Sequence, residues 1–305
     1  MQRKIVTNTS NLFRPIHRLR AAVGLLFSLF SFGFSFGLLF GLLFGLLFSP
    51  SPLAAQRGAN NRERVGMERI DAAEGARRLE AFRQQRLQGD YVFEFQLEHK
   101  PRRAATVRYD GVMWGSWNEQ GAITRFKIFP QETKKNPAPA LVELIVQNGA
   151  APAAWIRRGS AEQFKRVEGA ALFAPLLPGL VYSVFDLQMP FIYWEDFIYE
   201  GPSLVGVSRV GQRFLMLPPA GSQSAARGIK GVRVWLDDTY NALWRVEVVR
   251  DDDQVSSKFA VESFKKVQKQ YIVKRITLTD YPGKDRTTFN VVDASVGLKL
   301  DDALF

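Results

Sequence analysis

The sequence predicts an α+β protein that is mainly β, in which about 11 short strands form one large antiparallel sheet. Three observations support this prediction. Apolar and polar residues alternate from Tyr91 to His99, turn-forming pairs recur from residue 100 almost to the end, and only one long stretch, residues 63–88, favours a helix. Strands that follow one another through short turns are typical of a meandering antiparallel sheet.

The first 55 residues predict export and are excluded from the fold. Five basic residues precede an uncharged run of 28 residues, Ala21–Phe48, and Ser49–Ala55 is a segment of small and turn-forming residues. This order is the layout of a secretory signal that is cleaved after Ala55. As a helix the run would measure roughly 40 Å, so a retained inner-membrane anchor stays open. In both cases the basic residues favour residues 56–305 outside the cytoplasm.

Charge and cysteine content exclude several kinds of partner and site. Without the five basic residues that precede the apolar run, the formal net charge falls from +11 to +6, and the surplus is spread along the chain. This does not indicate nucleic acid as a partner, but attraction to an anionic membrane surface stays open. The chain has no cysteine, which excludes disulfides, thiolate metal sites, cysteine nucleophiles and a lipidated cysteine at the cleavage site.

A polar linker, residues 56–62, leads into the predicted helix of residues 63–88. On a helix its apolar residues fall within a sector of roughly 120°; they are Val65, Ala72, Ala76, Leu79 and Phe82. Gly89-Asp90 is expected to end the helix.

The remaining elements are strands, turns and one insertion. In residues 91–99, Phe93, Phe95 and Leu97 share one face, as in a half-buried antiparallel strand. We expect further strands near residues 104–109, 123–129, 141–147, 153–158, 204–209, 213–217, 230–237, 243–250, 255–264, 271–280 and 286–293. Turns are expected at Lys100-Pro101, Asp110-Gly111, Gln120-Gly121, Asn148-Gly149, Asp237-Asp238, 251–253 and Pro282-Gly283. Residues 159–200 are apolar and broken by proline, which indicates short helices lying across the sheet.

The residues that carry enzyme chemistry are sparse. Of the two histidines, His17 precedes the apolar run, and His99 alone cannot form a zinc site. We expect His99, near a strand end, to be solvated. Neither His-Glu-x-x-His nor Gly-x-Ser-x-Gly occurs. The sequence therefore predicts no enzyme, no catalytic residue, no metal and no cofactor.

Aromatic residues are abundant in the part of the chain after the export segment. The sheet is expected to have one apolar face, with one long helix and the insertion to cover it. A sheet that its own helices cover incompletely is suited to an apolar ligand cavity.

The second half of the chain has a strand, an Asp-x-x-Tyr turn and a returning strand at residues 233–245, followed by Phe264–Val267 with Tyr271–Val273 as the next hairpin. In this order of segments it resembles the LolA-like family of outer-membrane lipoprotein-sorting proteins. Leu298–Phe305 is similar to the family's closing Leu-x-Asp-x-Leu-Phe, and Leu187–Asp196 lies where related members have an Asp-rich segment.

The resemblance, which covers roughly residues 63–305, implies a strongly curved antiparallel sheet that forms an unclosed barrel. It also implies that an N-terminal helix and a helical insertion act as a lid over an apolar cavity, which holds acyl chains of lipoproteins crossing the periplasm. An inner-membrane transporter and an outer-membrane acceptor would then be partners. We expect the cavity and lid to use Leu79, Phe82, Phe93, Phe95, Leu97, Val107, Tyr109, Phe126, Ile128, Met189, Phe191 and Tyr193.

A second hypothesis stays open at this point. A retained anchor would favour a membrane-bound envelope sensor or scaffold, which uses the same fold to bind a partner protein or a glycolipid. A hydrolase is disfavoured because the residues for a nucleophilic site are missing.

Overall fold

The computed structural model describes residues 67–131, 139–149, 151–159, 162–205 and 209–305. They form one compact unit, which lies within Asn61–Phe305. The expected export segment, the linker 56–62 and the first residues of the expected helix, 63–66, lie outside the described residues. In the described ranges, no helix is both long enough and apolar enough to cross a membrane.

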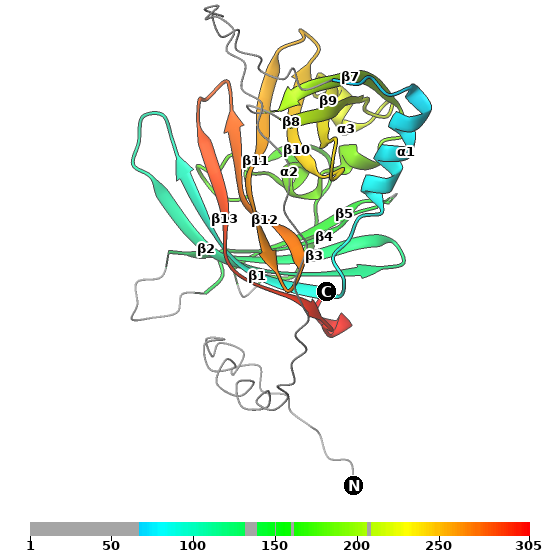
Figure 1. The fold of residues 1–305 in the computed structure, drawn as a ribbon. Helices are drawn as coiled ribbons and strands as arrows, with labels where there is room; N and C mark the ends of the chain where they lie inside the picture. The colour runs from blue at the N-terminus through cyan, green and yellow to red at the C-terminus, as the bar shows by residue number, and fades with distance from the viewer. Residues whose placement is uncertain (1–66, 132–138, 150, 160–161, 206–208) are drawn as a thin grey trace, which may run out of the picture. The chain divides into compact units, whose positions relative to one another are not determined.

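The described residues contain one antiparallel sheet of 13 strands (Figure 1). The first six are β1 (Asp90–Lys100), β2 (Val107–Asn118), β3 (Gly121–Pro130), β4 (Val142–Gln147), β5 (Ala153–Arg158) and β6 (Lys165–Arg166). The others are β7 (Phe197–Val205), β8 (Arg209–Met216), β9 (Ile229–Asp237), β10 (Leu243–Arg250), β11 (Val255–Val267), β12 (Gln270–Asp280) and β13 (Arg286–Leu298).

The order of the strands makes the sheet an open one. It runs β6-β5-β4-β3-β2-β1-β13-β12-β11-β10-β9-β8-β7, so nearly every strand pairs with its neighbours in sequence. The exception is the pairing of β1 with β13, which sets Phe95 opposite Val291 and Leu97 opposite Phe289. β6 and β7 are the two edges, and the curved sheet does not close into a barrel. The predicted fold class, a mainly β protein with an unclosed antiparallel sheet, is confirmed.

Short helices complete the described part of the chain. They are α1 (Ala72–Arg83), α2 (Val184–Gln188) and α3 (Gln223–Ala226), with 3₁₀ turns η3 (Gly169–Phe173), η4 (Pro190–Tyr193) and η5 (Asp302–Leu304). α1 is shorter than the expected helix of residues 63–88. It begins where the Asp71 side chain accepts a hydrogen bond from the Glu74 N–H at 2.7 Å, an N-cap that fixes the start of the helix. The C-cap is Gln84.

Two turn and strand predictions are wrong. Asp110-Gly111 is not a turn but the middle of β2, where Gly111 pairs with Phe95. The Phe95 ring lies on this glycine so closely that a Cβ atom would overlap the ring. Glycine is used here for the close approach of a cross-strand aromatic ring.

The expected strand 204–209 is also wrong, because β7 ends at Val205 and β8 begins at Arg209. β7 and the two-residue strand β6 were not predicted. Both lie in or next to the insertion 159–200. Its prolines argue against strands, because proline is disfavoured inside a sheet. Pro202 is tolerated in β7 because this strand is an edge of the sheet.

The prediction that His99 is solvated is wrong too. Its side chain is only 3% exposed, and Nδ1 lies 2.9 Å from the Thr287 hydroxyl oxygen. The reason is that β1 continues to Lys100 and pairs with β13 along this whole length. Burial lowers the pKa of His99.

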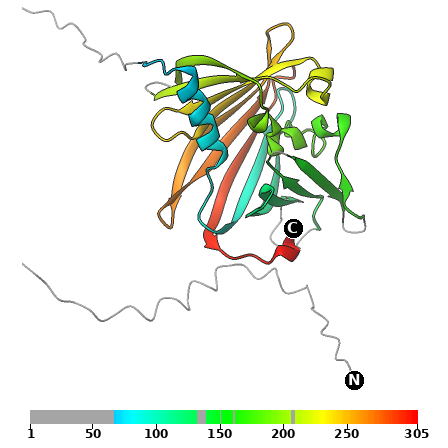
Figure 2. The same cartoon turned by 90° about the vertical axis from the view of Figure 1, so that its right-hand side faces the viewer.

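The core lies on the inner face of the curved sheet. Figure 2 shows α1 and the short helices of the insertion packed on this side. Buried residues of β1, β3, β4 and β8–β13 form one apolar cluster with Leu79 of α1 and with the insertion. The prediction that short helices of the insertion lie across the sheet is thereby confirmed.

The packing of Phe95 on Gly111 gives a first prediction. Gly111→Ala should lower the free energy of unfolding by about 1–3 kcal/mol, because the added methyl group must displace a buried ring. Urea unfolding measures the change. A double variant with Phe95→Leu should recover part of the loss relative to the sum of the two single changes, and strict additivity would contradict the contact.

Candidate functional site

The insertion fills the hollow of the sheet and leaves two small pockets. One is lined by Val246, Val248, Ser257, Phe259 and Leu278 of the sheet and by Asp186, Met189 and Phe191 of the insertion. The other is lined by Phe95, Leu97, Phe126, Ile128 and Phe289 of the sheet and by Leu176, Tyr182 and Leu187 of the insertion. We call them the β11 pocket and the β1 pocket. The adjacent α2 residues Asp186 and Leu187 line different pockets, so α2 separates the two.

Both pockets are small. Each has a free volume of about 10 Å³, which is room for about one water molecule. The insertion therefore acts as a plug on the inner face, and we call residues 169–194 the plug.

Six of the residues expected to line the cavity lie at these pockets. Phe95, Leu97, Phe126 and Ile128 line the β1 pocket, and Met189 and Phe191 line the β11 pocket. Leu79 and Phe93 are buried in the same core, and Phe82, Tyr109 and Tyr193 pack partly buried against it. Val107 is 43% exposed at the start of β2, away from these residues.

Sequence reasoning missed the residues that occupy the hollow, above all Leu176, Tyr182 and Leu187. It also missed the wall of the β11 pocket on β10–β12. One signal was available for the plug, since Ser183-x-x-Asp186 is a capping-box pattern that predicts a helix start at this point. For the wall of the β11 pocket, the alternation of Val246 and Val248 indicates which face of the strand is apolar. It does not indicate which residues pack on that face.

The plug is held mainly by apolar packing. The Phe173 and Phe185 rings stack with centroids 4.8 Å apart, and Phe191 lies 5.6 Å from Phe185. The polar ties from the plug to the strands are few, among them Arg158 Nη1 to the Leu176 carbonyl at 2.6 Å. Apolar packing is non-directional, so most of this attachment depends on buried apolar area and shape.

Two polar side chains of the plug, Asp186 and Tyr182, affect how firmly it is held. Asp186 Oδ2 accepts hydrogen bonds from the Ser183 backbone N–H at 2.8 Å and from the Ser183 hydroxyl at 2.5 Å. Burial raises the pKa of Asp186 to about 6. Tyr182 is 2% exposed, and its hydroxyl has no hydrogen-bond partner among the described residues. An unpaired buried hydroxyl costs about 1–3 kcal/mol, which weakens the seating of the plug.

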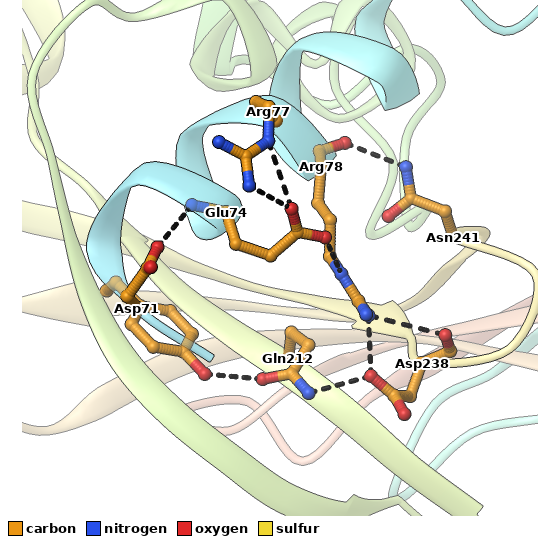
Figure 3. Close-up of polar contacts among 8 residues, drawn as sticks. Asp71, Glu74, Arg77, Arg78, Gln212, Asp238 and Asn241 are labelled. Atoms are coloured by element: carbon orange, nitrogen blue, oxygen red, sulfur yellow. Dashed lines mark hydrogen bonds and ion pairs between the residues drawn. The ribbon is translucent and has the colours of Figure 1, made fainter. Parts of the chain in front are cut away.

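α1 is fastened to the turn between β9 and β10 (Figure 3). Arg78 Nη1 lies 2.5 Å from Asp238 Oδ1, and the Asn241 side-chain amide donates to the Arg78 carbonyl at 2.7 Å. Gln212 of β8 donates to the same Asp238 oxygen at 2.7 Å and accepts from the Tyr199 hydroxyl at 2.5 Å. These contacts join the lid helix to both β7–β8 and β9–β10.

The last turn of α1 is fastened to the plug. Arg83 donates from Nε to the Ile192 carbonyl and from Nη2 to the Trp194 carbonyl, both at 2.8 Å. Because one guanidinium binds both carbonyls, movement of the plug disturbs the lid helix as well. Lid and plug therefore form one coupled cover over the inner face.

No family model and no curated protein matches the sequence. Solved structures do match the fold. A DUF1329 family protein from Desulfovibrio piger superposes with a TM-score of 0.62 at 14% identity, covering 76% of this chain and 94% of the other. A protein domain assigned to outer-membrane lipoprotein sorting, from Vibrio parahaemolyticus, gives a TM-score of 0.61 at 14% identity, covering 75% and 94%.

The third similar structure decides the name of the fold. It is a LolA superfamily protein from Nitrosomonas europaea, with a TM-score of 0.54 at 13% identity over 77% of this chain and 97% of the other. The chain has a LolA-like fold. The resemblance seen in the sequence is thus supported at the level of the fold.

The fastening of the LolA-like lid gives a second prediction. Arg78→Met should speed hydrogen exchange of the α1 amides and lower the free energy of unfolding by about 1 kcal/mol, because the helix loses its tie to Asp238. Arg77→Met is the matched control: Arg77 lies on the same helix, its side chain is 69% exposed, and its ion pair is with Glu74. Equal exchange in the two variants would contradict the role of Arg78.

Proposed function

We propose that the protein is an exported, non-enzymatic carrier that binds acyl chains of lipoproteins on the inner face of its sheet. It would act in the periplasm, with the N-terminal segment either cleaved near Ala55 or kept as an inner-membrane anchor. The observation that carries the proposal is the apolar plug. Its side chains occupy the inner face of the sheet, where an apolar ligand would fit. The LolA-like fold supports this reading.

The small volume of the pockets implies that a ligand must exchange with side chains of the plug. About 10 Å³ of free volume in each pocket is far too little for an acyl chain, so a ligand must take the place of plug residues. The strands would lose contact with Leu176, Tyr182 and Leu187 and gain contact with methylene groups, each worth about 0.8 kcal/mol when buried. Because apolar contacts replace apolar contacts, the net cost of opening is small.

The coupled cover indicates which parts move. For the plug to leave, the two hydrogen bonds from Arg83 to the Ile192 and Trp194 carbonyls must break. The ties of Arg78 and Asn241 at the middle of α1 can stay. We therefore propose that α1 pivots about the turn between β9 and β10 while the plug withdraws. The proposal requires no cofactor, and the described residues hold no group of three or more metal-binding side chains that could form a metal site.

Photo-crosslinking with a lipidated peptide tests the carrier function. The peptide carries a diazirine on its acyl chain, and the unlipidated peptide is the control. We expect crosslinks in β1, β3 and β13, at peptides that contain Phe95, Ile128 and Phe289, because these residues line the β1 pocket. Crosslinks confined to residues 21–48, or none at all, would contradict the proposal. Mapping the crosslinks by mass spectrometry separates the two parts of the chain.

The raised pKa of Asp186 gives a pH prediction. Its folded-state pKa of about 6 lies above the ordinary value of 3.8, so the folded chain binds the proton more tightly than the unfolded chain. The stability that this proton contributes is fully present below about pH 4 and is lost as the pH rises through 6. Relative to Asp186→Asn, the wild type should lose at most about 3 kcal/mol over this range.

Urea unfolding at a series of pH values measures this difference. Ser183→Ala serves as the control, because it removes the hydroxyl of the capping box but keeps the carboxylate. Parallel pH profiles for the wild type and Asp186→Asn would show that the carboxylate is not buried by the plug.

A further inference from the structure

The β11–β12 hairpin has a basic and aromatic tip that the carrier function does not use. Residues 263–276 contain five cationic residues, Lys265, Lys266, Lys269, Lys274 and Arg275, and no acidic residue. At the turn, Gln268 and Lys269 both have positive φ, 46° and 69°. Tyr271, directly after the turn, is 68% exposed. A large aromatic side chain on a tight hairpin is thus presented to solvent among cations.

This tip lies beside two other exposed loops. Gln270 exchanges hydrogen bonds with the backbone of Gln88, at 2.7 and 3.2 Å, and so joins the hairpin to the segment after α1. In that segment, Gln85 donates to the Tyr240 carbonyl at 3.4 Å. Tyr240, in the turn between β9 and β10, is 67% exposed. We call Tyr240, Lys266, Lys269 and Tyr271 the tyrosine–lysine rim.

Cations and rings are paired along the rim. Lys266 Nζ lies 5.7 Å from the centre of the Tyr271 ring. The Arg209 guanidinium lies 6.0 Å from the Tyr240 ring and 4.9 Å from the Trp244 ring. Nearby acids are engaged: Asp238 with Arg78, and Asp237 with Arg209. Amphipathic rings beside long cationic side chains are typical of residues that sit at a membrane–water boundary.

We propose that the tyrosine–lysine rim docks the domain on the surface of an anionic lipid bilayer. The positive charge of the rim is complementary to an anionic leaflet, which is why we choose this partner. Each basic residue near such a leaflet strengthens binding by about fivefold. The exposed tyrosines supply rings that insert at the level of the headgroups. The rim also adjoins the C-terminal end of α1, so docking places the lid at the bilayer. This surface is separate from the inner face, and the proposal does not depend on the cargo.

The chain contains its own control for this surface. The β12–β13 hairpin is at the opposite end of β12 and also presents a tyrosine and a lysine, Tyr281, 44% exposed, and Lys284, with φ 58°. It differs in charge, because Asp280 and Asp285 lie in the same turn and accept hydrogen bonds from backbone N–H groups. The two hairpins therefore share residue types but not net charge.

Site-specific fluorescence on the full chain tests the proposal. Since the chain has no cysteine, Lys269→Cys and Lys284→Cys each give one attachment point for an environment-sensitive NBD probe. We expect a blue shift at position 269 with vesicles of phosphatidylcholine and phosphatidylglycerol. The shift should be weak with pure phosphatidylcholine, should fall as salt is raised, and should be absent at position 284. Any tethering by the N-terminal segment affects both positions equally.

A charge reversal completes the test. In the chain labelled at 269, Lys266→Glu should weaken binding to the anionic vesicles by about 30-fold, because one cation is removed and one anion added. A blue shift of equal size at 269 and 284, a response independent of phosphatidylglycerol, or no response to any vesicle would overturn the proposal. The last result would leave a protein partner as the occupant of the rim.

Discussion

An open antiparallel sheet that curls on itself creates one large apolar face, and this face must be covered. The chain meets the requirement with two elements from distant parts of the sequence, α1 and the plug of residues 169–194. Leu79 of the helix and Tyr182 of the plug are both buried in the same cluster as the strands. Arg83 binds the two elements to each other. The other features of the inner face follow from how this cover is held.

The cover is held by forces that suit exchange. Apolar packing supplies most of its attachment, and apolar packing does not distinguish strongly between a side chain and an acyl chain. The polar groups of the plug weaken it, because the Tyr182 hydroxyl has no hydrogen-bond partner among the described residues and the apolar surroundings raise the pKa of Asp186. At the pivot, α1 has directional bonds that do not involve the plug, between Arg78, Asp238 and Asn241. In the proposed exchange, these bonds would keep the lid attached while the plug leaves.

Much of the sheet could be predicted from the sequence, because its signals are local. The alternation of Phe93, Phe95 and Leu97 and the hairpin turns from Asp237-Asp238 onward act over a few residues. The wrong predictions concern residues whose contacts come from other strands. The place of Gly111 is explained by the ring of Phe95, and the burial of His99 by its pairing with Thr287. For the candidate site, the strand face was predictable from periodicity. That the plug fills this face was not, because only the tertiary structure brings Tyr182 to Phe289.

Hydrogen exchange of the plug, with and without a bound lipidated peptide, tests the central claim most directly. The account predicts that saturating ligand speeds exchange of the amides in residues 169–194, because the acyl chain takes the place of the plug. Amides of β1 and β13 should keep or gain protection, because their inner face stays covered. If the ligand binds and the plug amides exchange as slowly as before, the plug does not leave, and the account is contradicted.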